Sequence, residues 1–274
     1  MQKIIEAIVY GIIQGLTEFI PVSSTAHIRV VPALLNWGDP GAAFTAVIQI
    51  GTLIATFVYF RKDIVNLILG FLGALKKRDF SDPYARISIL IILGTIPISI
   101  FGLVLKKYIE SDFRGLYVIC ASLIGLAVLL YTAEKAASRK KEFEQISVLD
   151  GIIIRFAQAV ALIPGSSRSG VTITAGLFCG LKRDTAARFS FLLSIPAVFL
   201  SGVYELYSER EALLNENTIS LIVATVVSGI VGYISIAFLL NYLKTRSNML
   251  FIIYRIVLAA AILILLGTGV LTNL

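Results

Sequence analysis

Residues 14–27 read Gln14-Gly-Leu-Thr-Glu18-Phe-Ile-Pro21-Val-Ser23-Ser24-Thr25-Ala-His27, and residues 158–172 read Gln158-Ala-Val-Ala-Leu-Ile-Pro164-Gly165-Ser166-Ser167-Arg168-Ser169-Gly170-Val-Thr172. In both stretches an apolar run that contains a glutamine ends at Ile-Pro. Serines follow, and a second apolar run begins after them. Charged side chains inside apolar segments are costly and usually serve a function. Two related stretches in one chain therefore predict a single site assembled from two halves.

The composition around these stretches is that of a membrane protein. Of the 274 residues, 57% are hydrophobic and 15% are charged, whereas soluble domains carry about 25% charged residues. Several continuous apolar runs reach the roughly 20 residues that cross a bilayer core. We therefore expect an all-α polytopic membrane protein. The net charge of +7 is explained by basic loops on the cytoplasmic side, and with no groove-reading motif present we expect no nucleic-acid partner.

The apolar runs fall into two length classes. Six are long enough to span a membrane, at about 42–60, 86–105, 115–133, 186–205, 218–242 and 250–271. Two pairs of shorter runs are each broken by proline and serine, at about 4–20 with 24–36 and 149–163 with 168–181. Non-helical backbone at membrane depth persists only where protein or a wet cavity satisfies it. Each pair is therefore predicted to be a re-entrant helical hairpin whose tip lies inside the membrane.

The charge of the loops predicts how the chain is oriented. Lysine and arginine concentrate in the expected loops 61–86 and 134–147 and recur near 182–183 and 244–246, whereas the segment 205–217 contains Arg210 as its single basic residue. The positive-inside rule places the basic loops in the cytoplasm. The one discordant loop is 106–114, which places Lys106, Lys107 and Arg114 outside. The first hairpin then enters the membrane from outside and the second from inside.

The opposite entry of the hairpins predicts an internal inverted repeat. The two halves cover approximately 1–133 and 148–271 of a single membrane domain, 1–274. Inverted repeats with broken helices place their binding site near the bilayer midplane, at the interface between the repeats. The two serine-rich tips are expected to meet there.

The residues that follow each proline are suited to binding an anion. Pro21 and Pro164 end their helices, and the next serines fall at the N-cap or first turn of a new helix. Free N–H groups and the positive end of the helix dipole bind anions at such a terminus. Two converging termini would suit a doubly charged anion. The alternative is that these serines and threonines only cap helices and allow close packing.

Three charged or titratable residues extend this site. The planar fork of Arg168 suits bidentate contact with phosphate. Glu18 shares a helix face with Gln14, and three roles stay open for it: ligand of a divalent cation, acid or base, or ion-pair partner of Arg168. His27 is the only histidine and lies on the face of Ser24. A lone histidine is often a satisfied core residue, but in this position we expect a general base or nucleophile.

The motifs Gln14-x-x-x-Glu18, Pro21-Val-Ser-Ser-Thr-x-His27 and Pro164-Gly-x-Ser-Arg-Ser-x-x-Thr172 resemble those of the undecaprenyl-diphosphate phosphatase family, the bacitracin-resistance type of bacterial inner-membrane enzyme. The likeness extends over almost the whole chain. It implies hydrolysis of a C55 lipid diphosphate to the monophosphate and inorganic phosphate, which recycles the carrier lipid for peptidoglycan and other envelope polymers. It also implies a site open to the periplasmic or outer face and often a divalent cation, Mg²⁺ or Ca²⁺, without an organic cofactor.

The residue patterns and the family resemblance together give the expected site residues. Those expected to act in catalysis are Glu18, Ser24, His27 and Arg168. Those expected to bind the substrate are Gln14, Ser23, Thr25, Gly165, Ser166, Ser167, Ser169 and Thr172. Many relatives have glutamate where Gln14 stands, which weakens any requirement for a carboxylate there.

The preferred mechanism from sequence is attack on the terminal phosphorus by Ser24 activated by His27. Direct attack by His27, or activation of water by His27, stays open, and Glu18 would hold a metal or manage the proton. The rival class is an inverted-repeat secondary transporter or lipid flippase, which shares this architecture, and an anion channel is a weaker third alternative. A homo-oligomer is left open by the sequence.

Overall fold

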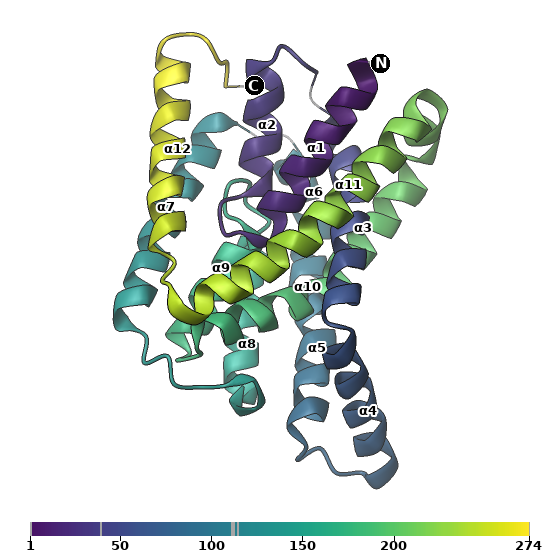
Figure 1. Cartoon of the computed structure of the whole chain (residues 1–274), viewed down its shortest axis with the longest axis vertical. Helices are drawn as coiled ribbons and strands as arrows, with labels where there is room; N and C mark the ends of the chain where they lie inside the picture. Colours follow the sequence, from purple (N-terminus) through teal and green to yellow (C-terminus); the bar gives the residue numbers. More distant parts are fainter. Residues whose placement is uncertain (1, 39, 111–112, 114, 274) are drawn as a thin grey trace.

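A computed structural model of the chain describes the backbone of residues 2–38, 40–110, 113 and 115–273, and the side chains of these residues except 42, 106, 110 and 210–217. The chain is helical through most of this length (Figure 1). In order, the elements are α1 (Gln2–Phe19), α2 (Ser24–Leu34), α3 (Gly41–Tyr59), α4 (Arg61–Lys77), α5 (Pro83–Val104), α6 (Lys106–Glu110), α7 (Leu116–Ala136), the 3₁₀ turn η2 (Phe143–Gln145), α8 (Val148–Val160), α9 (Arg168–Phe178), α10 (Arg183–Ser208), α11 (Arg210–Thr245) and α12 (Met249–Gly267).

The expected polytopic membrane architecture is confirmed. Within the part of the chain that the structure describes, five helices are long and apolar enough to cross a membrane, namely α5, α7, α10, α12 and the Thr218–Thr245 part of α11. A sixth candidate is the pair α3 and α4, which together pass the same test but meet at a bend of 76°. Their exposed faces are rich in isoleucine, leucine and phenylalanine, as expected of surfaces in contact with lipid.

One expected loop is wrong. The basic residues between 61 and 86 indicated a loop, but residues 61–77 form helix α4. The segment between its terminal charges is apolar and packs as an antiparallel neighbour on α5, where the Ser88 hydroxyl donates to the carbonyl oxygen of Leu67 at 2.8 Å. Arg61, Lys76 and Lys77 are exposed at the two ends of this helix, so the charge cluster marks helix ends and not an unstructured stretch.

Two short helical hairpins pack against the longer helices. In Figure 1 the hairpin α1–α2 reaches down from the end that holds both termini, and α8 reaches up from the opposite end before the chain turns into α9. The side chain of Arg255 on α12 donates to carbonyl oxygens of both turns, to Pro21 at 3.3 Å and to Gly165 at 3.2 Å. The two tips therefore meet in the middle of the molecule.

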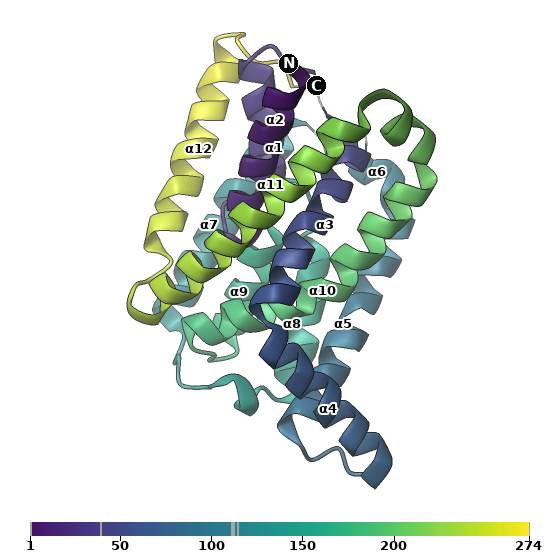
Figure 2. The same ribbon diagram turned by 45° about the vertical axis from the view of Figure 1, so that its right-hand side comes forward.

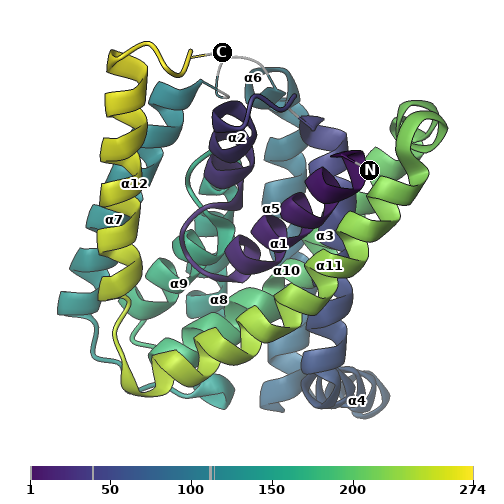
Figure 3. The same ribbon diagram turned by 45° about the horizontal axis from the view of Figure 1, so that its top comes forward.

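Long diagonal helices hold the first hairpin in place. Helix α11 crosses the molecule and packs against both α1 and α3 (Figures 2 and 3). Small residues allow these backbones to approach closely, as is common between membrane helices. A Cβ atom added at Gly11 of α1 would stand 2.6 Å from the carbonyl oxygen of Ala224 on α11. The first tip is thus fixed by packing along most of α1.

The connections with basic residues gather at the end opposite the termini. There the buried carboxylate of Glu134 accepts from Arg183 at 2.7 Å, from Arg139 at 3.4 Å and from the Asn248 amide at 2.6 Å. These contacts join α7, α10 and the turn before α12. The loop before α5 lies at the same end (Figure 1). The acidic segment 205–217 lies at the turn between α10 and α11, and the side chains of 210–217 are outside the described residues.

Candidate active site

Both tips end in a serine that caps the following helix in the same unusual way. Ser23 precedes α2 with φ of 76° and accepts from the Ala26 N–H at 3.3 Å. Ser167 precedes α9 with φ of 67° and accepts from the Gly170 N–H at 3.2 Å. Positive φ is uncommon for a residue other than glycine and often marks a functional site. Each cap satisfies one N–H, and the other first-turn amides have no acceptor within their own helix.

The carboxylate of Glu18 is the centre of the polar contacts at this junction. Oε1 accepts from Nη2 of Arg168 at 2.7 Å, and Oε2 accepts from Nε2 of Gln14 at 2.7 Å. The Ser24 hydroxyl donates to the same Oε2 at 3.5 Å, a long contact of the kind that tightens when substrate binds. The structure therefore brings Gln14, Glu18, Ser24 and Arg168 together, and the predicted pairing of Glu18 with Arg168 is present.

Arg168 has bonding capacity left over beside this carboxylate. Its side chain is only 12% exposed, and its buried Nη1 has no hydrogen-bond partner in the described part of the chain. Buried polar groups are nearly always bonded, so an exception needs a physical explanation. Nη2 of the guanidinium donates to Glu18, and Nη1 is free to donate to an oxygen of an anion.

His27 is engaged away from Ser24. Its Nδ1 lies 2.7 Å from the carbonyl oxygen of Ser23, and its Nε2 lies 2.7 Å from the hydroxyl of Tyr254 on α12. With both ring nitrogens in these contacts, the imidazole does not hydrogen-bond to the Ser24 hydroxyl. The i, i+3 spacing placed the two residues on one face, but the donor that reaches Nε2 comes from a helix more than two hundred residues away.

Some of the other residues predicted to bind substrate lie at the two tips, and others make contacts that hold neighbouring helices together. Ser167 and Ser169 hydroxyls lie 3.2 Å apart at the start of α9, and Thr25 is exposed in the first turn of α2. The Thr172 hydroxyl instead lies 2.6 Å from that of Ser190 on α10, so it joins two helices. Gly165 adopts φ of +89°, and its carbonyl oxygen, like that of Ser166, accepts from Arg255.

Arg255 is a structural residue that the sequence argument missed. It is fully buried and donates to backbone carbonyl oxygens of both tips and of α7, those of Pro21, Ser122, Leu123, Gly165 and Ser166. A signal was available, because an arginine within an apolar membrane helix is functional by default. Tyr254, next to it, was missed for the same reason: the segment 250–271 was assigned only as a span.

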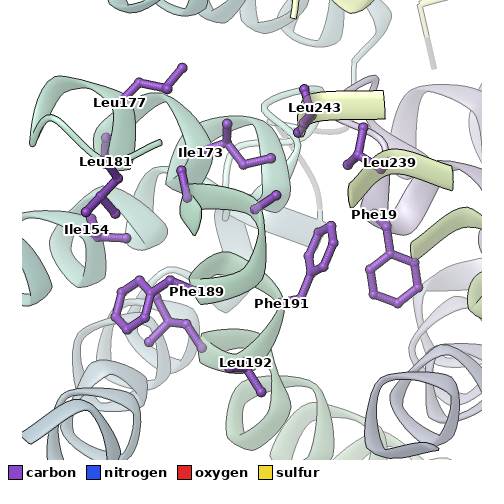
Figure 4. Packing of buried hydrophobic residues seen from close by; sticks show 14 of the residues in the cluster. Phe19, Ile154, Ile173, Leu177, Leu181, Phe189, Phe191, Leu192, Leu239 and Leu243 are labelled. Carbon is purple, nitrogen blue, oxygen red and sulfur yellow. The ribbon is translucent and has the colours of Figure 1, made fainter. Parts of the chain in front are cut away.

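An aromatic contact closes the site on the side of α10. Phe19, which follows Glu18, packs edge-on against Phe191 with ring centroids 5.0 Å apart. Figure 4 shows these two rings facing each other, with Leu239 and Leu243 of α11 near Phe19. Phe19 and Phe191 are almost completely buried. The residue that follows Glu18 therefore packs α1 against α10.

The residues of the site do not form a cation site by themselves. Among the described residues, no group of three or more His, Cys, Asp or Glu side chains is placed to hold a metal ion. Glu18 supplies a single carboxylate, both of whose oxygens accept hydrogen bonds from Gln14 and Arg168. Mg²⁺ is usually held by one or two carboxylates with substrate phosphates and water. Glu18 would therefore hold a cation only together with oxygens of the substrate phosphates.

Comparison with known proteins gives the same assignment as the motifs. Residues 7–261 match the family described as bacitracin resistance protein BacA. The undecaprenyl-diphosphatase of Chlorobaculum tepidum is 53% identical and covers 97% of this chain and 98% of its own length. That of Chlorobium limicola is 53% identical over 98% of this chain and 99% of its own, and that of Myxococcus xanthus is 51% identical over 97% and 90%. The matched region contains both hairpins and nearly every helix, and the chain belongs to the bacitracin resistance protein BacA family.

Proposed function

We propose that this protein hydrolyses undecaprenyl diphosphate to undecaprenyl phosphate and inorganic phosphate, recycling the lipid carrier of envelope polymers and conferring bacitracin resistance. The observation that carries the proposal is the buried Glu18–Arg168 pair, which leaves one guanidinium nitrogen free where two helix N-termini meet. Full-length relatives named undecaprenyl-diphosphatase support the choice of substrate.

The binding of the diphosphate follows from the electrostatics of the junction. Nη1 of Arg168 donates to an oxygen of the terminal phosphate while Nη2 stays on Glu18. The first-turn amides of α2 and α9 add donors, and both helix dipoles favour negative charge at this point. Donors fixed by folding stabilise charge that develops on the transferring phosphoryl group without reorganisation.

The structure favours Glu18 as the proton acceptor for Ser24. The hydroxyl oxygen of Ser24 forms a bond to the terminal phosphorus, and the bond from that phosphorus to the bridging oxygen breaks. The bridging oxygen leaves with the electron pair as part of the lipid monophosphate, and the hydroxyl proton passes to Oε2 of Glu18, its hydrogen-bond partner. Water then cleaves the phosphoserine and releases inorganic phosphate.

This assignment changes the mechanism preferred from sequence. In the mechanism preferred from sequence, His27 was the base for Ser24. Both nitrogens of His27 instead lie within hydrogen-bond distance of Ser23 and Tyr254. Direct attack by His27 predicts a phosphohistidine, and direct attack by water predicts no covalent intermediate. Rapid quench of the enzyme with ³²P-labelled substrate, in acid and in alkali, separates the three routes, because phosphoserine survives acid, phosphohistidine survives alkali, and attack by water leaves no label on the protein in either.

The proposed setting is the bacterial inner membrane, with the site open to the periplasmic side. Support comes from the clustering of basic connections at the end of the molecule opposite the termini, since lysine and arginine favour the cytoplasmic side. The first hairpin, which carries Ser24 and His27, reaches the site from the other end.

Phosphate release from undecaprenyl diphosphate in detergent micelles tests the proposed function. Purified wild-type protein, with and without Mg²⁺ or Ca²⁺, should release one phosphate per lipid and leave the monophosphate. Arg168→Ala should remove this activity without changing the helical circular dichroism spectrum. A well-folded wild type that releases no phosphate, but moves a lipid diphosphate across liposome membranes, would make the protein a transporter instead.

A further inference from the structure

The contacts of His27 define which of its nitrogens carries hydrogen. The carbonyl oxygen of Ser23 can only accept, so Nδ1, at 2.7 Å, must be the donor in that contact. In the neutral imidazole the lone pair is then on Nε2. The Tyr254 hydroxyl, 2.7 Å from Nε2, donates into that lone pair. The carbonyl contact selects one of the two neutral tautomers, and the hydroxyl supplies the donor that this tautomer needs at Nε2.

Tyr254 also fixes the plane of the imidazole. The two rings are stacked, with centroids 5.7 Å apart and an angle of 9° between their planes. A single side chain therefore contributes both a stacking surface and a hydrogen bond to His27. Tyr254 is 43% exposed. Its contact with His27 is therefore made near the surface of the protein.

The position of Tyr254 relative to the first tip is set by its neighbour in sequence. Arg255 is completely buried and donates to Pro21 in the first tip and to Ser166 in the second. These bonds attach this turn of α12 to both hairpins. The backbone of Tyr254 is thus held at a fixed place beside α2, within reach of His27.

We propose that Tyr254 is a positioning residue of the active site: in the Nδ1–H tautomer set by the Ser23 carbonyl, its hydroxyl donates to Nε2 of His27 and keeps that lone pair directed at α12 and away from Ser24. This inference rests on the proposed phosphatase function for its catalytic consequence and on the geometry alone for the tautomer.

The arrangement lets His27 change its protonation state without turning. When Nε2 takes up a proton, it becomes a donor, and the rotatable hydroxyl of Tyr254 becomes its acceptor. Nδ1 keeps its bond to Ser23 in both states. The pair therefore stays hydrogen-bonded through a proton transfer, and the imidazole keeps its orientation.

The single histidine of the chain makes the tautomer directly measurable. Protein produced without a histidine tag and labelled with ¹⁵N-histidine gives one pair of imidazole nitrogen signals. We expect Nδ1 in the protonated range and Nε2 in the unprotonated range above the imidazole titration. In Tyr254→Phe, which keeps the stacking ring, the Nε2 signal should move to higher frequency because it loses its donor. A dominant Nε2–H tautomer in the wild type would overturn the proposal.

Kinetics of the same variants test the consequence for turnover. Tyr254→Phe should lower kcat for phosphate release about 10-fold or more while KM changes little, because Nε2 of His27 is then free to accept from the Ser24 hydroxyl and draw it away from Glu18. Tyr254→Leu should lower kcat further because stacking is also lost. The matched control is Tyr242→Phe on α11, whose ring packs on Phe238 and Phe251 and whose loss of a hydroxyl should change neither measurement. Wild-type activity in Tyr254→Phe with an unchanged histidine spectrum would also overturn the proposal.

The two readouts separate failure of this inference from failure of the proposed function. If the wild type released no phosphate, the phosphatase function would fall, and the nitrogen spectra of wild type and Tyr254→Phe would still decide the tautomer assignment. If the wild type is active and Tyr254→Phe is not impaired, only the role of Tyr254 falls.

Discussion

Nη2 of Arg168 lies 2.7 Å from Oε1 of Glu18, and the two residues are 150 positions apart in sequence. Their side chains are 12% and 6% exposed. Removing one member of a buried pair costs about 3–5 kcal/mol, because the other charge is left without compensation. The contact therefore joins the two hairpins and also contributes charge to the site.

Gln14→Glu should be tolerated, with a dependence on pH that the wild type lacks. Gln14 donates to Oε2 of Glu18, and a glutamate there can donate only when it carries a proton. The neighbouring carboxylate favours the protonated form. Activity should be close to wild type below the pKa of the new carboxyl group and should fall as pH rises through it. Phosphate release measured from about pH 5 to about pH 9 checks this, and inactivity at every pH would contradict it.

Arg255→Met should lower both stability and activity. Methionine fills much of the same volume, but the carbonyl oxygens of Pro21, Gly165 and Ser166 lose their donor. Each unsatisfied buried group costs about 1–3 kcal/mol. We expect a clearly lower melting temperature in detergent and a loss of phosphate release. Arg61→Met on exposed α4 is the matched control, and an equal melting temperature for the two variants would show that Arg255 does not hold the tips.

Gly165→Ala should disrupt the second tip specifically. Gly165 adopts φ of +89°, and an added Cβ would lie 2.6 Å from the carbonyl oxygen of Ile119. The same change at Gly73, in the middle of α4, meets no atom within 4 Å and should stabilise the helix by about 0.5–1 kcal/mol. Thermal unfolding of both variants should therefore shift in opposite directions. A neutral Gly165→Ala would contradict the described turn.

The elements around the site could be predicted from sequence more completely than the contacts within it. Apolar run length and the Pro-Ser breaks located both hairpins to within a few residues, because these signals are local. The base of Ser24 was not predictable in this way. Helical spacing places His27 beside Ser24, but Tyr254 and Ser23 occupy the imidazole nitrogens, and only the packing of α12 determines that. Helix α4 was not predicted, because the basic residues at its ends indicated a loop although its centre is apolar. The inverted repeat stays a prediction, although Ser23 and Ser167 share their cap geometry.

The orientation can be checked with single cysteines in a background without Cys120 and Cys179. Ser81→Cys lies in the exposed turn before α5, at the basic end, and Glu209→Cys lies in the exposed turn before α11. An impermeant thiol reagent should label position 209 in intact spheroplasts and position 81 only after permeabilisation. The reverse pattern would place the basic end outside.

The measurement that tests the central claim most directly is phosphate release by two variants, one from each hairpin. Ser24→Ala and Arg168→Ala should each lose about 10²-fold or more in kcat/KM, while Ser81→Ala and Arg61→Ala, at exposed positions, stay at the wild-type rate. Loss in both would establish one phosphatase site built from the two tips. If either Ser24→Ala or Arg168→Ala kept wild-type turnover, that hairpin would not contribute to the chemistry and the account would be wrong.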